Sequence, residues 1–423
     1  MSLGRTLYRT ATRAVHPFLG LLISHRVRRG KEDGERSAER FARIPGHANS
    51  SPLVWLHGAS IGESRLLIAL AEALIEHRPH LNFLFTSQTR TSAELVDKAI
   101  ASSETLKGRG THQFAPIDAP AIARRFIEHW TPQAAIFAEG EIWANLLTEL
   151  NKADIPTALI NARMTEKSID GWEKWPAFAK ELFGSFDIVL AADQKTAAGL
   201  TRLGARKVLQ PGNLKTSLPA PTSDPAELAT LRTQFKGDRH CLAAISTHSG
   251  EEAFALDAVA LMDETPALVI VPRHPERAPE IMELLKSRGV SFHQRSLGQS
   301  MTGPVDLILA DTLGEVGLFA ELADTVYLGG GHAAGVGGHN PIEILQTGTP
   351  VLTGPDQFNF EDITSDLAGI AGFSIVETPS DLAADFPAAA PSEEMRLFLK
   401  QRTREPMEQT VAALLNIIPA ETS

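Results

Sequence analysis

The sequence predicts an α/β protein of two Rossmann-like domains that face a cleft, with a closing helix at the C-terminus. Three observations support this prediction. Apolar runs of strand length alternate with amphipathic helical stretches. The alternation stops at a proline-rich break and then starts again. The last helical stretch, 392–417, is followed by no further strand pattern.

The first series of elements begins after Ser50. Continuous apolar runs between helical patterns are typical of a parallel sheet that is covered on both faces. Strands are expected at 53–56, 83–86, 134–137, 157–160 and 187–192, and helices at 64–77, 119–130 and 143–152. Since ligands of such sheets bind beyond the carboxyl ends of the strands, functional residues are expected directly after these runs.

A break at 211–226 separates the two series. This segment holds four prolines and little apolar periodicity, which indicates a linker between domains. A second series then predicts strands at 241–245, 267–271, 306–310, 325–329 and 350–354, with helices near 251–262, 276–287, 314–322 and 361–369. Two complete α/β halves are therefore expected.

The composition excludes several classes of protein. With 423 residues the chain is long enough for two domains. Its single cysteine, Cys241, can form neither an internal disulfide nor a cysteine-based zinc site, which fits a reducing cytoplasm. The net charge of −11 disfavours nucleic acid as a partner.

The N-terminal segment is basic around a short apolar run at 17–23. This run is shorter than the roughly 20 residues that a membrane-spanning helix needs, and no small-residue cleavage site follows it, which disfavours a secretory signal. Two interpretations remain: a frayed, solvated terminus, or a basic amphipathic segment that lies on an anionic membrane surface, which we favour. The first thirty residues hold no Asp or Glu, and their arginines are Arg5, Arg9, Arg13, Arg26, Arg28 and Arg29.

Acidic residues follow two strands of the first half. In WLHGASIGES (55–64), small residues make a turn after the strand, and Glu63 stands near the start of the next helix. A carboxylate there can act as a general base toward a sugar hydroxyl, although a helix N-terminus also attracts an acid for its dipole, and composition alone favours that reading. AEGEIWANLL (138–147) places Glu139 and Glu141 in a second such turn, where they could stabilise positive charge on a sugar.

Phosphate-type turns dominate the second half. Lys215, in PGNLK at the domain junction, could reach a phosphate, although a linker lysine is more often solvated. STHSGEE (246–252) resembles a phosphate-cradling turn that opens a helix. In VPRHPER (271–277), Arg273 suits a phosphate or a pyrimidine ring. A metal site at His274 is disfavoured, because no second ligand stands at a suitable spacing.

The glycine-rich string LGGGHAAGVGGHNPIE (328–343) is the strongest of these signals. A strand runs into the loop, and Pro341 suits the first position of the following helix. Glu343 would lie in the first turn of that helix, where it could accept hydrogen bonds from ribose hydroxyls. No GK[ST] follows the glycines, which disfavours hydrolysis of ATP.

These strings together resemble the Kdo (3-deoxy-D-manno-octulosonic acid) transferases, which are metal-independent glycosyltransferases of the GT-B architecture acting on lipid A. Ten strings occur in the family's order between about residues 55 and 362: HGASIGE, FAPIDAP, EGEIWAN, NARMTEKS, PGNLK, STHSGEE, PRHPER, DTLGE, GGHNPIE and GPDQFNF. Each string is modest evidence by itself, but ten in order are very specific.

The resemblance implies roles for individual residues. Glu63 would be the general base, and Glu139 and Lys215 would stabilise the transition state. The cytidine nucleotide would lie against Pro272, Arg273, Leu313, Gly314, Glu315, Asn340, Pro341, Ile342 and Glu343. The resemblance implies neither a metal nor a cofactor.

The resemblance also implies the reaction and its location. Kdo would pass from CMP-Kdo to a lipid A precursor, lipid IVA, with inversion and release of CMP. The expected place is the cytoplasmic side of the inner membrane. The expected organisation is a basic membrane-associating segment (1–50), an acceptor-binding domain (51–212), a linker (213–226), a CMP-sugar-binding domain (227–390) and a C-terminal helix that packs back toward the N-terminal domain (391–423).

Four positions depart from the family's usual pattern, and they leave acceptor fit and loop geometry open: Ala93, Ala144, Gly331 and His332. Two other classes of protein remain alternatives. A sugar-nucleotide 2-epimerase shares the two-domain architecture, but it would leave the basic N-terminus unexplained. A nucleotide-binding scaffold without activity would give no reason for acids clustered in one half and phosphate-type loops in the other.

Overall fold

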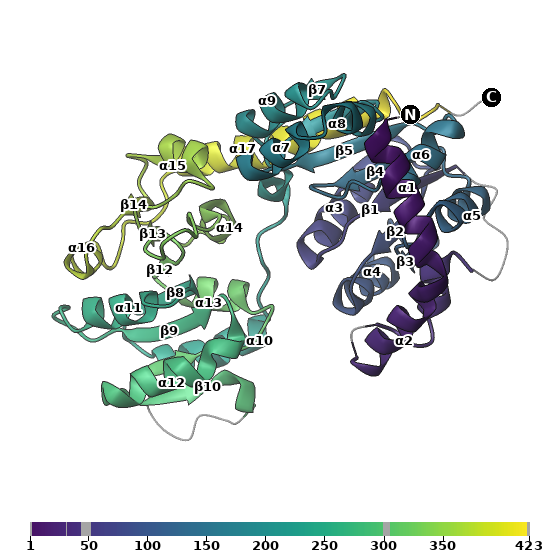
Figure 1. Cartoon of the computed structure of the whole chain (residues 1–423). Coiled ribbons are helices and arrows are strands. Elements are labelled where there is room, and N and C mark those ends of the chain that lie inside the picture. The colour runs from purple at the N-terminus through teal and green to yellow at the C-terminus, as the bar shows by residue number, and fades with distance from the viewer. Residues whose placement is uncertain (1, 31, 44–51, 299–304, 421–423) are drawn as a thin grey trace. The chain divides into compact units, whose positions relative to one another are not determined.

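The structure is a computed structural model that describes residues 2–30, 32–43, 52–298 and 305–420. The chain divides into two compact units (Figure 1). Unit 1 comprises residues 1–218 and 403–423, and unit 2 comprises residues 219–402. The boundary expected at residue 50 falls outside the described residues.

Unit 1 is built on a seven-stranded, all-parallel sheet with the strand order β3-β2-β1-β4-β5-β6-β7. The order reverses between β1 and β4, and this switch point is where ligands of open α/β sheets bind. The strands are β1 (Leu53–His57), β2 (Asn82–Ser87), β3 (Gly110–Phe114), β4 (Ala134–Ala138), β5 (Thr157–Ala162), β6 (Ile188–Ala191) and β7 (Val208–Leu209).

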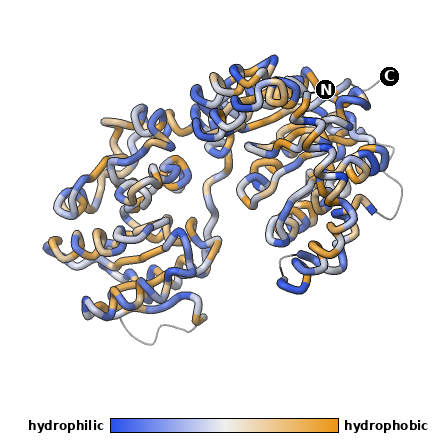
Figure 2. Tube along the Cα trace, in the orientation of Figure 1, coloured by the Kyte–Doolittle hydropathy of each residue, from blue (hydrophilic) through white to orange (hydrophobic). Residues whose placement is uncertain are grey.

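Helices cover both faces of this sheet, because each central strand is apolar on both sides. In β1, for example, Val54 and Leu56 join one buried cluster while Leu53 and Trp55 join the other. Hydrophobic residues recur along the strands in Figure 2. The helices are α1 (Leu3–Val15), α2 (Leu19–Arg28), α3 (Ile61–His77), α4 (Arg90–Ser102), α5 (Pro120–Trp130), α6 (Ala144–Lys152), α7 (Glu166–Glu173), α8 (Pro176–Phe183) and α9 (Gln194–Arg202), with short 3₁₀ turns η1 (His16–Phe18), η2 (Ser37–Phe41) and η3 (Leu214–Ser217).

Unit 2 repeats the plan, with the strand order β10-β11-β9-β8-β12-β13-β14 and a switch point between β8 and β12. Its strands are β8 (Cys241–Thr247), β9 (Ala267–Pro272), β10 (Phe292–Gln294), β11 (Leu307–Leu309), β12 (Thr325–Leu328), β13 (Val351–Thr353) and β14 (Phe373–Ile375). Its helices are α10 (Pro225–Leu231), the π-helical turn η4 (Arg232–Lys236), α11 (Glu251–Val259), η5 (Pro275–Arg277), α12 (Ala278–Ser287), η6 (Arg295–Leu297), α13 (Val316–Leu322), α14 (Pro341–Leu345), α15 (Glu361–Leu367) and α16 (Pro379–Ala384).

The last helix, α17 (Glu393–Leu415), starts in unit 2 and ends in unit 1. Its final turns bury Val411 and Leu414 in the same apolar cluster as β1 and α3. The backbone therefore passes between the units twice, once after residue 218 and once inside this helix.

The N-terminal helices belong to unit 1. The Tyr8 hydroxyl donates to the buried Asp118 carboxylate (2.8 Å), which also accepts the backbone N–H groups of Asn145 (3.1 Å) and Leu146 (2.8 Å) at the start of α6. Burial, followed by the charge and the hydrogen bond of Asp118, raises the pKa of Tyr8. This segment is thus folded onto the unit, and the frayed-terminus interpretation is wrong.

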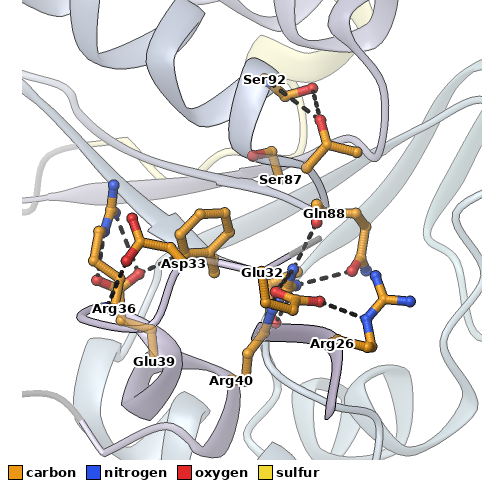
Figure 3. Close-up of polar contacts among 12 residues, drawn as sticks. Arg26, Glu32, Asp33, Arg36, Glu39, Arg40, Ser87, Gln88 and Ser92 are labelled. Atoms are coloured by element: carbon orange, nitrogen blue, oxygen red, sulfur yellow. Dashed lines mark hydrogen bonds and ion pairs between the residues drawn. The ribbon is translucent and has the colours of Figure 1, made fainter. Parts of the chain in front are cut away.

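A buried arginine fixes the chain after α2 to the edge of the first sheet (Figure 3). Arg40, only 3% exposed, donates to the Glu32 carboxylate (2.9 Å) and to the backbone carbonyls of Gln88 (2.6 Å) and Ala115 (3.1 Å). Gln88 and Ala115 directly follow β2 and β3. The segment that follows α2 is therefore held at the carboxyl ends of the strands.

Candidate active site

Glu63 lies where the switch point of unit 1 predicts a ligand. Ser60 caps α3 and accepts the Glu63 backbone N–H (3.3 Å), while the Glu63 carboxylate accepts the Ala59 N–H (2.6 Å) and the Ser60 hydroxyl (2.7 Å). A Cβ on Gly58 would lie 2.8 Å from the Glu63 Cβ, so the turn needs glycine there. The carboxylate thus serves the helix cap. Because it has about four lone-pair sites, it can still accept a proton.

Glu139 follows β4, on the other side of the same switch point. Its Oε1 lies 2.6 Å from the Lys215 Nζ, and both side chains are partly exposed. A Cβ on Gly62, the residue before Glu63, would lie 3.7 Å from the same Nζ. The ammonium therefore lies beside the first turn of α3. The structure thus pairs Glu139 with Lys215 and places the Lys215 ammonium beside the helix turn that carries Glu63.

Glu141, the second acid of the EGE turn, has different partners. Its Oε2 lies 3.0 Å from the Nε2 of the buried His57 and accepts the Trp143 indole N–H (2.9 Å). Burial works to raise the pKa of Glu141, but the hydrogen bonds and the His57 charge outweigh it and hold that pKa below its usual range. Glu141 therefore orders the turn that presents Glu139.

In unit 2, a buried carboxylate organises the glycine-rich loop. Glu251, 1% exposed, accepts the backbone N–H groups of Gly330 (2.7 and 2.8 Å), His332 (3.0 Å) and His248 (2.8 Å). One of these amides, that of His248, lies in STHSGEE, the turn that resembles a phosphate cradle. The protein partner of these amides shows that Glu251 shapes the two turns.

The neighbouring Glu252 is also structural. It is buried against Arg277, with Nη1–Oε1 and Nη2–Oε2 distances of 2.7 and 3.1 Å, and it accepts the Thr247 hydroxyl at 2.7 Å. This bidentate pair ties the end of β8 to the turn after β9. It leaves Arg273, whose side chain is exposed, as the arginine of PRHPER that can meet a ligand.

Histidines gather at the switch point of unit 2. The Nε2 atoms of His248 and His339 lie 2.9 Å apart with their rings stacked, and the His274 ring centroid lies 6.0 Å from that of His248. Burial, and then the charges of His248, Arg273 and His274, lower the pKa of His339 to about 4. These three histidines were not among the predicted site residues. Only their positions in the sequence could have indicated them: His248 directly follows β8, His274 follows β9 closely, and His339 lies just before α14.

The predicted nucleotide-binding residues all lie in unit 2, at or beyond the carboxyl ends of β9, β11 and β12. Leu313 is 78% exposed. Glu315 pairs with Arg295 (2.7 Å); burial tends to raise the pKa of Glu315, but Arg295 and Thr312 lower it. Ile342 is fully buried, so it can offer a ligand only its backbone. The remaining residues are Pro272 at the buried end of β9, exposed Arg273, Gly314, Asn340 as the cap of α14, Pro341 at its first position, and exposed Glu343.

Two features are absent from the described residues. Among the residues that the structure describes, no group of three or more His, Cys, Asp or Glu side chains is arranged to hold a metal ion. No helix within the described ranges is long and apolar enough to cross a membrane.

Known structures share the two-unit plan. The UDP-GlcNAc 2-epimerase of Neisseria meningitidis, bound to UDP-GlcNAc, aligns with a TM-score of 0.52 over 86% of this chain and 99% of its own, at 14% sequence identity. At that identity the likeness concerns the fold alone. Two Rossmann-like units of this kind make up the GT-B architecture.

Sequence comparison gives the family. The profile of 3-deoxy-D-manno-octulosonic-acid transferase (kdotransferase) matches residues 35–218. The 3-deoxy-D-manno-octulosonic acid transferase of Bordetella pertussis is 32% identical over 93% of this chain and 93% of its own length, and that of Haemophilus influenzae is 32% identical over 95% and 93%. The chain belongs to the Kdo transferase family, and it is a glycosyltransferase.

Proposed function

We propose that this Kdo transferase moves Kdo from CMP-Kdo to a lipid A precursor, lipid IVA, with inversion and release of CMP. The observation that carries the proposal is the Glu139–Lys215 pair at the switch point of unit 1, beside the first turn of α3, which carries Glu63. Family membership supplies the sugar, and the loops of unit 2 supply the nucleotide site.

The chemistry assigned to unit 1 follows from its charges. Glu63 takes the proton of an acceptor hydroxyl, whose oxygen attacks the anomeric carbon of the sugar. The bond between that carbon and the phosphate oxygen breaks, and CMP leaves with the electron pair. Lys215 and Glu139 stabilise the separated charges of this transition state. Attack on the face opposite the leaving group inverts the configuration.

The nucleotide is assigned to unit 2. Arg273 is exposed directly after β9, and Leu313 and Gly314 form an exposed turn after β11. Asn340 caps α14 by accepting the Ile342 N–H (3.1 Å), which leaves its amide N–H₂ as a donor. An arginine, an exposed apolar side chain and an amide suit a cytidylate, which carries a phosphate, a flat base and ribose hydroxyls.

We also assign the N-terminal helices to the cytoplasmic surface of the inner membrane. On α1, the polar side faces the protein: Arg5 pairs with Glu181, and Arg9 lies 3.8 Å from Glu149. The apolar side faces outward at helical spacing. The exposed apolar residues are Leu3 (73%), Leu7 (53%) and Val15 (52%) on α1, Phe18 (64%) at the end of η1, and Leu21 (69%) and Leu22 (52%) on α2. An exposed apolar stripe of this kind suits a lipid surface.

This geometry changes the expected source of membrane affinity. Arg26 pairs with Glu32 (2.9 Å), so three of the six N-terminal arginines, Arg5, Arg9 and Arg26, lie against carboxylates of the protein. We therefore expect the exposed apolar side chains to contribute more to membrane affinity than the basic charge does. We expect Leu7→Ser with Phe18→Ser to reduce co-sedimentation with anionic vesicles, while Leu397→Ser, an equally exposed site in unit 2 (61%), leaves it unchanged. Equal binding by both variants would contradict this assignment.

Mass spectrometry tests the reaction itself. The enzyme is incubated with CMP-Kdo and a tetra-acylated lipid A precursor, and the acceptor gains the mass of one or more Kdo units if the proposal is right. A matched incubation with UDP-GlcNAc detects a 2-epimerase. No mass gain from CMP-Kdo, with a folded enzyme that binds CMP, would refute the proposal.

A further inference from the structure

A buried amide connects Glu139 with the chain segment that carries Lys215. Asn161 is 0% exposed, and both polar atoms of its side chain are in use. Its Nδ2 donates to the Glu139 Oε1 (3.2 Å), and its Oδ1 accepts the backbone N–H of Leu214 (2.9 Å). Leu214 directly precedes Lys215. One side chain therefore holds the carboxylate and the chain segment that carries its ammonium partner.

The backbone is distorted in order to place this amide. The register between β5 and β6 shifts between Leu159 and Ala162, and such a bulge re-aims side chains at a strand end. Asn161, inside the bulge, has φ 47°, and Glu139 has φ 55°. Left-handed backbone costs a non-glycine residue about 1–2 kcal/mol, and strain of this kind concentrates at functional sites.

We propose that Asn161 is the positioning residue of the Glu139–Lys215 pair. The inference rests on the proposed function of that pair, and it adds a residue that does not itself touch the reacting atoms. The amide and the ammonium meet at the same oxygen, Oε1. Within the described part of the chain, Oε2 of Glu139 has no hydrogen bond, so Asn161 orients this second oxygen toward solvent or substrate.

Asn161→Asp tests the hydrogen bond to Glu139 most specifically. It keeps the shape, the tolerance for a left-handed backbone and the acceptor for Leu214, but a carboxylate oxygen replaces the donor to Glu139. Two carboxylates at about this spacing cannot both stay ionised easily, so one of them takes up a proton near neutral pH. We expect kcat to fall about 10- to 100-fold at pH 7.5, and to recover in part as the pH is lowered.

Three controls separate positioning from folding. CMP affinity, a property assigned to unit 2, should stay within about twofold of the wild type, and the melting temperature shows whether the fold is intact. Asn161→Gly removes both side-chain hydrogen bonds but permits the left-handed backbone, and it should lower kcat without the acidic recovery. In a Glu139→Gln background, Asn161→Gly should add less than about threefold, because its effect passes through Glu139.

The outcomes separate a failure of the proposed ion-pair role from a failure of the role assigned to Asn161. If Glu139→Gln transfers Kdo at the wild-type rate, the proposed role of the ion pair fails, and the inference fails with it. If Glu139→Gln is slow but Asn161→Asp has the wild-type kcat and pH profile, only the inference is overturned. If both variants are slow and their effects multiply independently in the double variant, Asn161 does not act through Glu139, and the inference is likewise overturned.

Discussion

The Arg40→Met variant offers a quantitative test of how the N-terminal segment is held. Arg40 makes five hydrogen bonds, to the Glu32 carboxylate, both oxygens of Gln88 and the Ala115 carbonyl, from a side chain that is only 4% exposed. Removing one partner of a buried ion pair costs about 3–5 kcal/mol. Because Glu32 keeps Arg26, we expect the lower end, about 3 kcal/mol in the free energy of unfolding of unit 1.

Arg26→Met is the matched control. Arg26 contacts the same Glu32 (2.9 Å), but its side chain is 43% exposed, and exposed pairs contribute about 0–1 kcal/mol. Urea denaturation gives both free energies, and limited proteolysis between α2 and β1 shows whether the segment detaches first. If Arg40→Met loses no more stability than Arg26→Met, the buried network of Figure 3 does not anchor the segment.

Two further predictions concern a histidine and a glycine. Burial, followed by the charges of neighbouring arginines, lowers the pKa of His112 to about 3. The neutral side chain therefore stabilises the fold fully above the ordinary histidine pKa of about 6.5. That contribution to the unfolding free energy is lost as the pH falls from there toward 3. The unfolding free energies of wild type and His112→Asn should therefore converge between pH 7 and pH 5; a constant difference would contradict the assignment. Gly338→Ala should weaken CMP binding more than Gly335→Ala. Both glycines have positive φ (78° and 77°), so the backbone strain is matched. Only at Gly338 would the new Cβ meet a side chain, that of Gln357 at 2.1 Å. Equal affinities by calorimetry would show that the close approach is not needed.

The central strands were predictable from sequence, and the edge strands were not. The four strands that the apolar pattern misses, β3, β7, β10 and β14, are the outermost strands of the two sheets. An edge strand has one neighbour and less burial, so β3 reads GTHQF and β10 reads FHQ, without an apolar run. The pattern reports burial on both faces, and only the inner strands have it.

The residues of the candidate site likewise fall into those that the sequence could predict and those that it could not. The positions of Glu63 and Glu139 after strands, and of Lys215 at the junction, were predictable from their motifs, and their catalytic roles stay predictions. The roles of Asn161 and Glu251 were not predictable, because they depend on a strand bulge and on amides about eighty residues away in sequence. The EGE turn offered two equivalent acids, and only their partners in the structure separate them: His57 and Trp143 for Glu141, Lys215 and Asn161 for Glu139.

The most direct test of the account is the Glu63→Gln variant in a transfer assay with CMP-Kdo and the lipid A precursor. The amide can still accept a hydrogen bond at the α3 cap, but it cannot take a proton at neutral pH. We predict an unchanged fold and CMP affinity with transfer at least about 100-fold slower. A folded variant that binds CMP and transfers Kdo within a few-fold of the wild-type rate would contradict the assignment of the base.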